Sequence, residues 1–342
     1  MCADDVVNRL RSDIPLRNAV YRAFAEGVEQ AQRFVVTTEA LGITNSLAYG
    51  RPTTLLSAMQ VVRSPYPKVW FEYEQADASE ARRRYDGDDP RPLEDHESRI
   101  RRVGILVETI GDERSYIAMP VVQFVDGGFR LMMHCGTADF AEDAPRDGVW
   151  TRRFDDAKQL AYDRLTGRSE LARRREKHLA DPKERSAMME YLGRFGYAVM
   201  PHMAEQLRMV GLPASTVTGL SGAGEEINYA GWAAREAAKT LVLHNLKNGV
   251  EVRAAALSDE AQRTRRRLNR PPLLDHHVLG LRLPRHIVRE EAGGFSGDAE
   301  DMRAHWVRGH LKVRSTGVYW WSPHIRGEPA LGFVDKTYAL RP

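Results

Sequence analysis

The side chains best suited to bind or act on an anion lie near the C-terminal end, on both sides of Ser315-Thr316-Gly317. Side chains of a β-strand alternate between two faces, so every second residue shares one face. A three-residue loop with Gly in its third, left-handed position is a common hairpin connection. We therefore predict a β-hairpin whose loop is Ser315–Gly317 and in which Arg314 pairs with Val318.

This pairing sorts the side chains by chemistry, and a loop one residue shorter or longer would mix the two sets, which favours the three-residue loop. The apolar face would hold Val307, Leu311, Val313, Tyr319, Trp321 and Ile325. The cationic face would hold Trp306, Arg308, His310, Lys312, Arg314, Trp320, His324 and Arg326. Because Arg and Lys neutralise phosphates and Trp offers a stacking surface, the second face predicts a nucleic-acid or other anionic ligand. Cover by an acidic segment or by a partner subunit is the alternative.

Two histidines of the cationic face raise the question of catalysis. His310 and His324 would be diagonal neighbours across the hairpin, roughly 7–8 Å apart or less. Beside a phosphate held by Arg, they could serve as general base and general acid in phosphodiester cleavage without a metal. They could equally hydrogen-bond or stack on a ligand with no reaction. His310 and His324 are therefore the candidate catalytic residues, and whether a reaction occurs stays open.

A second basic segment precedes the hairpin. Residues 263–270 contain five Arg and no acidic residue, although the formal net charge of the chain is only +3. On a helix, Arg263, Arg266, Arg267 and Arg270 would form one cationic stripe. The stripe could contact phosphates or simply face solvent. An acidic counterpart, residues 86–97, holds six acids and one Arg.

The common cofactor and metal motifs are missing from the sequence. Cys2 and Cys135 form neither a disulfide framework nor a zinc spacing. Gly219–Gly224 precedes a predicted helix but lacks the P-loop Lys and the dinucleotide-binding order of glycines. His276 and His277 are adjacent in a predicted strand and so point to opposite faces. We predict no metal and no cofactor.

The elements that must position these residues predict an α+β protein. We expect an N-terminal half with a small antiparallel sheet, a helical middle, and a C-terminal antiparallel sheet ending in the hairpin. Helices are predicted at 14–33, 53–62, 154–210 and 225–248, with breaks in the third at 181–182 and near 200–201. Strands are predicted at 68–74, 102–109, 115–125, 128–135, 250–255, 276–283 and 334–340. The expected division is an N-terminal α+β domain at 1–150, a helical region at 151–224, and a C-terminal α+β domain with the basic hairpin at 225–342.

Several C-terminal motifs resemble uncharacterised proteins of bacteriophages and prophages. They are Arg267–Val278, the Arg-Gly-His motif that ends at His310, Pro323–Gly327, and the Lys336-x-Tyr338 ending. A fainter similarity extends to Pro65–Glu72. The resemblance implies an origin in a mobile element and supplies no catalytic residues.

The leading hypothesis is a phage-type protein that binds DNA or RNA through the hairpin face, helped by the Arg263–Arg270 segment. One alternative is a phage assembly or interaction protein, or a self-assembling one, whose cationic face meets an acidic protein surface. The other is the two-histidine phosphodiesterase. Since no apolar run approaches the ~20 residues that span a bilayer and the N-terminus lacks signal-peptide features, we expect no membrane partner. The expected location is the host cytosol, or a phage particle if the protein is structural.

Overall fold

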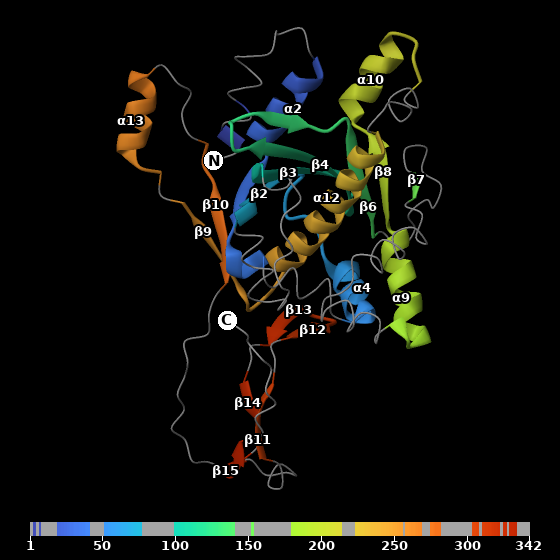
Figure 1. The fold of residues 1–342 in the computed structure, drawn as a ribbon, viewed down its shortest axis with the longest axis vertical. Coiled ribbons are helices and arrows are strands. Elements are labelled where there is room, and N and C mark those ends of the chain that lie inside the picture. Colours follow the sequence, from blue (N-terminus) through green and yellow to red (C-terminus); the bar gives the residue numbers. More distant parts are fainter. Residues whose placement is uncertain are drawn as a thin grey trace.

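A computed structural model of the chain shows a mixed α/β protein built around one ten-stranded sheet (Figure 1). It describes Ala3, Asp4, Val7 and residues 19–41, 51–76, 99–140, 152–153, 179–213, 223–255, 257–268, 274–281, 303–307, 310–321, 324–326 and 328–333. Among these residues, no helix is long and apolar enough to cross a membrane.

The central sheet draws its strands from most of the chain. They are β1 (Gln32–Val36), β2 (Lys68–Glu74), β3 (Ile100–Ile110), β4 (Asp112–Phe124), β5 (Phe129–Leu131), β6 (His134–Asp139), β7 (Arg152–Arg153), β8 (Phe195–Val199), β9 (Val250–Ala254) and β10 (His277–Leu281). Their order is β7-β8-β6-β4-β3-β2-β1-β10-β9, with β5 also paired to β4. β1 runs parallel to β2 and to β10, and the remaining pairs are antiparallel. Parallel neighbours need a crossover, and α4 (Pro52–Val61) lies between β1 and β2 in the chain.

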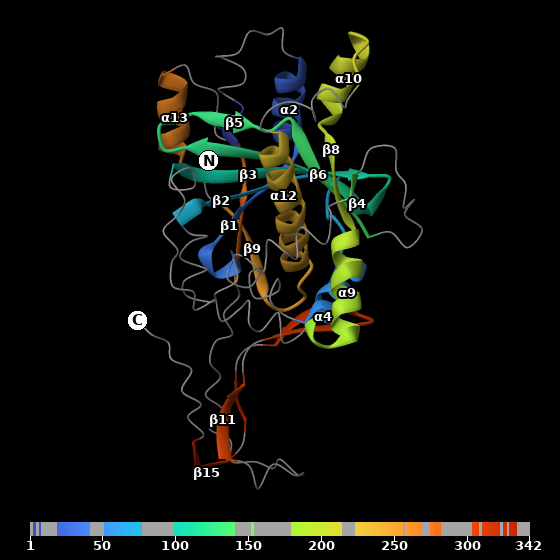
Figure 2. The ribbon, with the colours of Figure 1, turned by 45° about the vertical axis from the view of Figure 1, so that its right-hand side comes forward.

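Helices cover both faces of the sheet, as Figures 1 and 2 show. α12 (Ala223–His244) packs against β3, β4, β6 and β8 on one face, on the side where α4 contacts α9 (Pro182–Gly193). α2 (Ala19–Gln30) packs on β2 from the other face and contacts α10 (Pro201–Met209). Strands covered on both faces are apolar throughout rather than alternating, and Val69–Tyr73 of β2 is accordingly buried as a continuous run.

One glycine sets how closely α12 approaches the sheet. A Cβ atom on Gly136 of β6 would lie 2.0 Å from the carbonyl oxygen of Ala230 in α12. Only glycine fits at such a distance without moving the helix. The part of α12 around Ala230 is thereby held directly over Gly136 of β6.

The C-terminal strands form two small sheets beyond α12. β12 (His310–Arg314) and β13 (Gly317–Trp321) pair as a hairpin that contacts α4. β11 (Arg303–Val307), β14 (His324–Arg326) and β15 (Glu328–Phe333) form a three-stranded sheet that lies apart from the central sheet, at the lower end of Figure 1.

The mixed α/β class and most predicted elements are confirmed. α4, β2 and α12 match the predictions for 53–62, 68–74 and 225–248 within a few residues. Two predictions are wrong: the helical middle contains a strand, β8, and the single strand at 128–135 is two strands, β5 and β6. β8 is short and fully apolar on a sheet buried on both faces, so periodicity could not separate it from the flanking helices. The expected strand 334–340 lies outside the described residues.

Strands from all three predicted segments of the chain lie in the one central sheet: β1–β6 before 150, β7 and β8 between 151 and 224, and β9 and β10 after it. Residues on both sides of the expected boundaries, 141–151 and 214–222, are outside the described part of the chain. The division into 1–150, 151–224 and 225–342 stays a prediction.

Candidate functional site: the C-terminal hairpin

The hairpin exists, but its register differs from the predicted one by one residue. Arg314 pairs with Gly317, and Val313, not Arg314, pairs with Val318. The loop is therefore the two residues Ser315-Thr316, and Gly317, with φ +134°, begins β13. The predicted three-residue loop is wrong.

Docking against the rest of the molecule explains this register. Val318 accepts a backbone hydrogen bond from Lys247 (3.1 Å) in the turn after α12, and Leu246 forms a parallel bridge to Val318. Asn248 binds Trp320, two residues further along β13, by two hydrogen bonds: its side chain donates to the Trp320 carbonyl (2.9 Å) and accepts from the Trp320 amide (2.8 Å). These contacts join residues 72 apart in the chain, so no local turn signal could announce them.

The one-residue shift exchanges the environments of the two adjacent tryptophans. The inner face is Leu311 (9% exposed) and Val318 (1% exposed), with Val313 and Trp320 packed against the main core. Trp320 was expected on the cationic face and instead lies inside, whereas Trp321 was expected inside and is 40% exposed. Burial of four apolar side chains on one face fixes the register strongly.

The side of the hairpin turned away from the core carries Lys312, Arg314, Tyr319 and Trp321, and we call this side the outer face. The ammonium of Lys312 lies over the Trp321 ring, 4.2 Å from its centroid. The guanidinium of Arg314 lies 6.0 Å from the centroid of Tyr319, whose hydroxyl is 3.0 Å from that of Thr316. Each cation reaches diagonally across the hairpin to the ring of the other strand. Of the predicted cationic set, Lys312 and Arg314 stay on this face, and two aromatic residues that sequence reasoning placed inside join them.

The shift of register continues into the neighbouring strands. Arg326 pairs with His305, Ile325 with Trp306, and His324 with Val307. The predicted pairing of Arg314 with Val318, continued along the strands, would pair Trp306 with Arg326 and His310 with Ser322. Both pairings are wrong, since Trp306 pairs with Ile325 and His310 with Trp321. The proposed diagonal contact between His310 and His324 depended on the three-residue loop and loses its basis. Arg308 lies outside the described residues.

The second basic segment forms a helix, as predicted. α13 (Asp259–Arg267) begins at Ser258, whose hydroxyl accepts from the Ala261 amide, and it buries no residue. Arg263, Arg266 and Arg267 are exposed on it, and Arg270 lies outside the described residues. Figures 1 and 2 both place α13 at the opposite end of the central sheet from β12 and β13. The two basic segments therefore form two separate surfaces.

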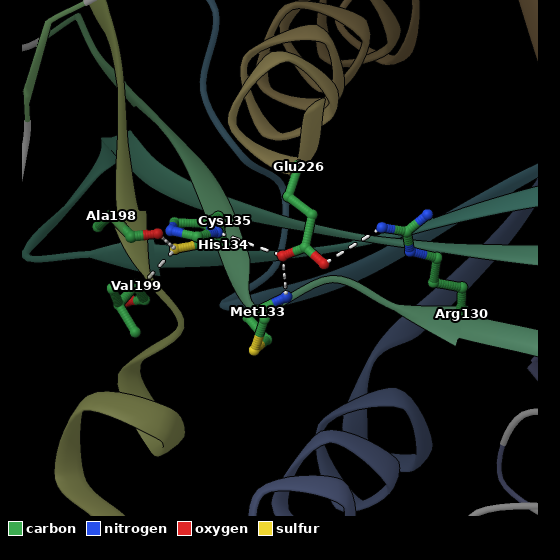
Figure 3. Close-up of polar contacts among 7 residues, drawn as sticks. All are labelled: Arg130, Met133, His134, Cys135, Ala198, Val199 and Glu226. Carbon is green, nitrogen blue, oxygen red and sulfur yellow. Dashed lines mark hydrogen bonds and ion pairs between the residues drawn. The ribbon is translucent and has the colours of Figure 1, made fainter. Parts of the chain in front are cut away.

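A buried polar cluster at the first turn of α12 escaped sequence reasoning (Figure 3). One carboxylate oxygen of Glu226 accepts a hydrogen bond from the Met133 amide (3.0 Å) and lies 3.3 Å from Nδ1 of His134. Its other oxygen lies 3.5 Å from a guanidinium nitrogen of Arg130. Glu226 and His134 are 92 residues apart, and no motif links them, so only the fold could reveal the contact.

The contacts of this cluster attach the first turn of α12 to the sheet and are not arranged for reaction with a substrate. The His134 side chain is 0% exposed, so no substrate atom reaches it in this fold, and its Nε2 has no hydrogen-bond partner among the residues that the structure describes. The neighbouring Cys135 is buried on the other face of β6, and burial raises the pKa of its thiol to about 12, which removes the reactive thiolate. Among the described residues, no group of three His, Cys, Asp or Glu side chains could hold a metal ion.

No protein-family model, no curated protein and no solved structure matches the chain. The geometry of the chain's own residues therefore carries the functional argument. Of the surfaces described, the outer face is the one that places cations and aromatic rings side by side in contact with solvent.

Proposed function

We propose that the protein binds nucleic acid through the outer face of the β12–β13 hairpin. The observation that carries the proposal is the pairing of Lys312 with Trp321 and of Arg314 with Tyr319 on a face turned away from the core. Cations supply phosphate contacts, and aromatic rings supply surfaces on which bases stack. The opposite face is docked, so the outer face is held in a fixed position toward solvent.

Magnitudes support a ligand on this face rather than a purely structural role. An exposed cation–π contact contributes only about 0.5–1 kcal/mol, so two such pairs add little to folding. Phosphate binding draws on the same cations far more strongly at low salt, because each neutralised phosphate releases condensed counterions. The resemblance of the C-terminal motifs to phage proteins agrees with a nucleic-acid ligand, by association only.

The test is a salt titration of oligonucleotide binding, followed by fluorescence anisotropy. We expect affinity to fall linearly with salt on a log–log plot, and the double variant Lys312→Ala/Arg314→Ala to reduce the slope by roughly 1.4–1.8. A matched control, Arg208→Ala/Arg253→Ala, removes the same charge from α10 and β9, where both side chains are exposed and paired with neighbouring glutamates. The control should leave the slope nearly unchanged.

Two results would overturn the proposal. If the wild-type protein binds no oligonucleotide at low salt, the outer face has another ligand, and an acidic protein surface becomes the leading alternative. If both double variants lower the slope equally, binding is spread over the whole surface. A third variant, Arg263→Ala/Arg266→Ala/Arg267→Ala, separates α13 from the hairpin as the binding surface.

A further inference from the structure

The two rings of the outer face are spaced along one strand. Tyr319 and Trp321 occupy alternate positions of β13, and Trp320 between them faces inward. At about 3.4 Å per residue, alternate positions of an antiparallel strand are roughly 6.8 Å apart. Successive stacked bases of a duplex rise only about 3.4 Å. Rings attached at this spacing match two adjacent bases that are separated better than two that remain stacked on each other.

The cations repeat with the same spacing. Lys312 and Arg314 are alternate residues of β12, and each lies beside one ring of β13. The outer face thus holds two copies of one unit, a cation next to an aromatic ring, displaced by two strand residues. A ligand that matches it must present an anion and a flat apolar group at each repeat.

From this geometry we infer that the ligand is single-stranded nucleic acid with two adjacent bases unstacked, bound along β13; the inference rests on the proposed function. Each ring stacks one base, and Lys312 and Arg314 contact the phosphates beside them. Stacking of a base on a protein ring contributes about 1–3 kcal/mol, more than the about 0.5–1 kcal/mol of an exposed cation–π contact. A base therefore displaces the cation from the ring, which frees the cation to meet a phosphate.

Duplex nucleic acid fits this face less well. Its bases are paired and stacked inside the helix, so it offers the hairpin phosphates and groove edges but no free base plane. Only Lys312 and Arg314 would then contribute to affinity. Dependence on the rings, rather than on the cations, separates the two ligands.

The experiment compares a labelled single-stranded oligonucleotide with its duplex in one low-salt buffer. Trp321→Leu and Tyr319→Leu remove a ring but keep an apolar side chain, whereas Trp321→Phe and Tyr319→Phe keep a ring. We expect each Leu variant to weaken single-strand binding by about 5- to 150-fold and each Phe variant to stay within about threefold of wild type. Duplex affinity should change less than twofold in all four variants.

A second ligand makes the test independent of how each variant folds. An oligonucleotide with two adjacent abasic sites keeps every phosphate and loses two bases. At the bound register, wild-type protein should bind a short abasic strand as weakly as the Trp321→Leu/Tyr319→Leu double variant binds the intact one, with no further loss when both changes are combined.

The failures of the two proposals are distinguishable. Equal single-strand and duplex affinities, with Leu variants unchanged and Lys312→Ala/Arg314→Ala still weakened, would overturn the single-strand inference and leave nucleic-acid binding standing. Absence of binding to either oligonucleotide, or a double variant that binds like wild type, would overturn the proposed function itself.

Discussion

The two ends of α12 use charged and polar side chains in opposite ways. At its first turn, Glu226 is buried, and its carboxylate oxygens are taken up by Met133, His134 and Arg130. Just past its last turn, Asn248 fixes the hairpin by two hydrogen bonds to the backbone of Trp320, and Lys312 and Arg314 beyond it lie beside the rings of Trp321 and Tyr319. At the first end, the polar groups attach α12 to the sheet. At the second end, Lys312 and Arg314 remain available to a ligand.

This difference shows where function is to be sought in the chain. A polar group in a core stabilises the fold only if its partners are all in place, so it has little left to offer a ligand. A cation held over an exposed ring is already positioned, yet it gives up only a weak contact when a ligand arrives. The comparison therefore predicts that substitutions at the buried end change stability, while substitutions on the outer face change binding.

The largest effect on stability is expected at the hairpin's inner face. Trp320→Ala should lower the free energy of unfolding by about 3 kcal/mol, the low end for a tryptophan because the residue is only partly buried. Trp321→Ala should cost less than about 1 kcal/mol, since the side chain is exposed. Urea unfolding of the two variants measures the difference. The reverse order would support the three-residue loop and contradict the assignment of these residues to the outer face.

The next effect concerns the buried end of α12. Glu226→Ala should lower the free energy of unfolding by about 2 kcal/mol, because the Met133 amide and the His134 imidazole lose their acceptor. Glu226→Gln keeps one carbonyl acceptor and should cost about half as much. Both variants should bind oligonucleotides like wild type at a temperature where they remain folded. A selective loss of binding in a stable Glu226→Gln protein would contradict the assignment of this cluster to attachment.

A smaller effect is expected where the turn after α12 contacts the hairpin. Asn248→Ala removes both side-chain hydrogen bonds to Trp320 and should destabilise the protein by about 1 kcal/mol. Asn248→Asp retains the acceptor for the Trp320 amide and should lie between Asn248→Ala and wild type. Hydrogen exchange of the Trp320 amide should accelerate in the same order. Unchanged exchange in Asn248→Ala would mean that packing alone holds the hairpin.

The smallest effect is one of reactivity. With a thiol pKa of about 12, Cys135 is thiolate in only about one molecule in ten thousand at pH 8. In a Cys2→Ser background, alkylation by iodoacetamide should therefore follow unfolding, with a rate that rises steeply in urea. Rapid labelling of folded protein would show that the sheet opens near β6, beside the buried cluster.

Local sequence patterns predicted much of the fold. The run of aromatic and β-branched residues at 68–74 and the long helical run at 225–248 became β2 and α12, because strong local patterns specify an element locally. β8 was missed, since a short apolar strand covered on both faces has no alternation to detect. The arrangement of the central sheet depends on pairing between distant segments, as where Phe34 of β1 pairs with His277 of β10. A side-chain hydrogen bond there joins Gln32 and His277, which are 245 residues apart.

The positions of the hairpin side chains were predicted only in part. Lys312 and Arg314 were placed correctly on the exposed face, whereas Trp320 and Trp321 were interchanged. A shift of one residue reverses every side chain of a strand, and the contact that sets the register comes from Asn248, far away in the sequence. The register with a two-residue loop also gives an apolar inner face, made of Leu311, Val313, Val318 and Trp320. A comparison of the two loops would therefore have placed Tyr319 and Trp321 on the outer face.

The most direct test of the central claim is ultraviolet cross-linking of a single-stranded oligonucleotide to the wild-type protein, with the cross-linked residues identified by mass spectrometry. Aromatic side chains that stack on bases are the favoured positions for such cross-links, so we expect them at Tyr319 and Trp321. The cross-links should weaken in Lys312→Ala/Arg314→Ala at moderate salt. Cross-links confined to other parts of the chain, such as α13, would contradict the assignment of the outer face as the nucleic-acid site.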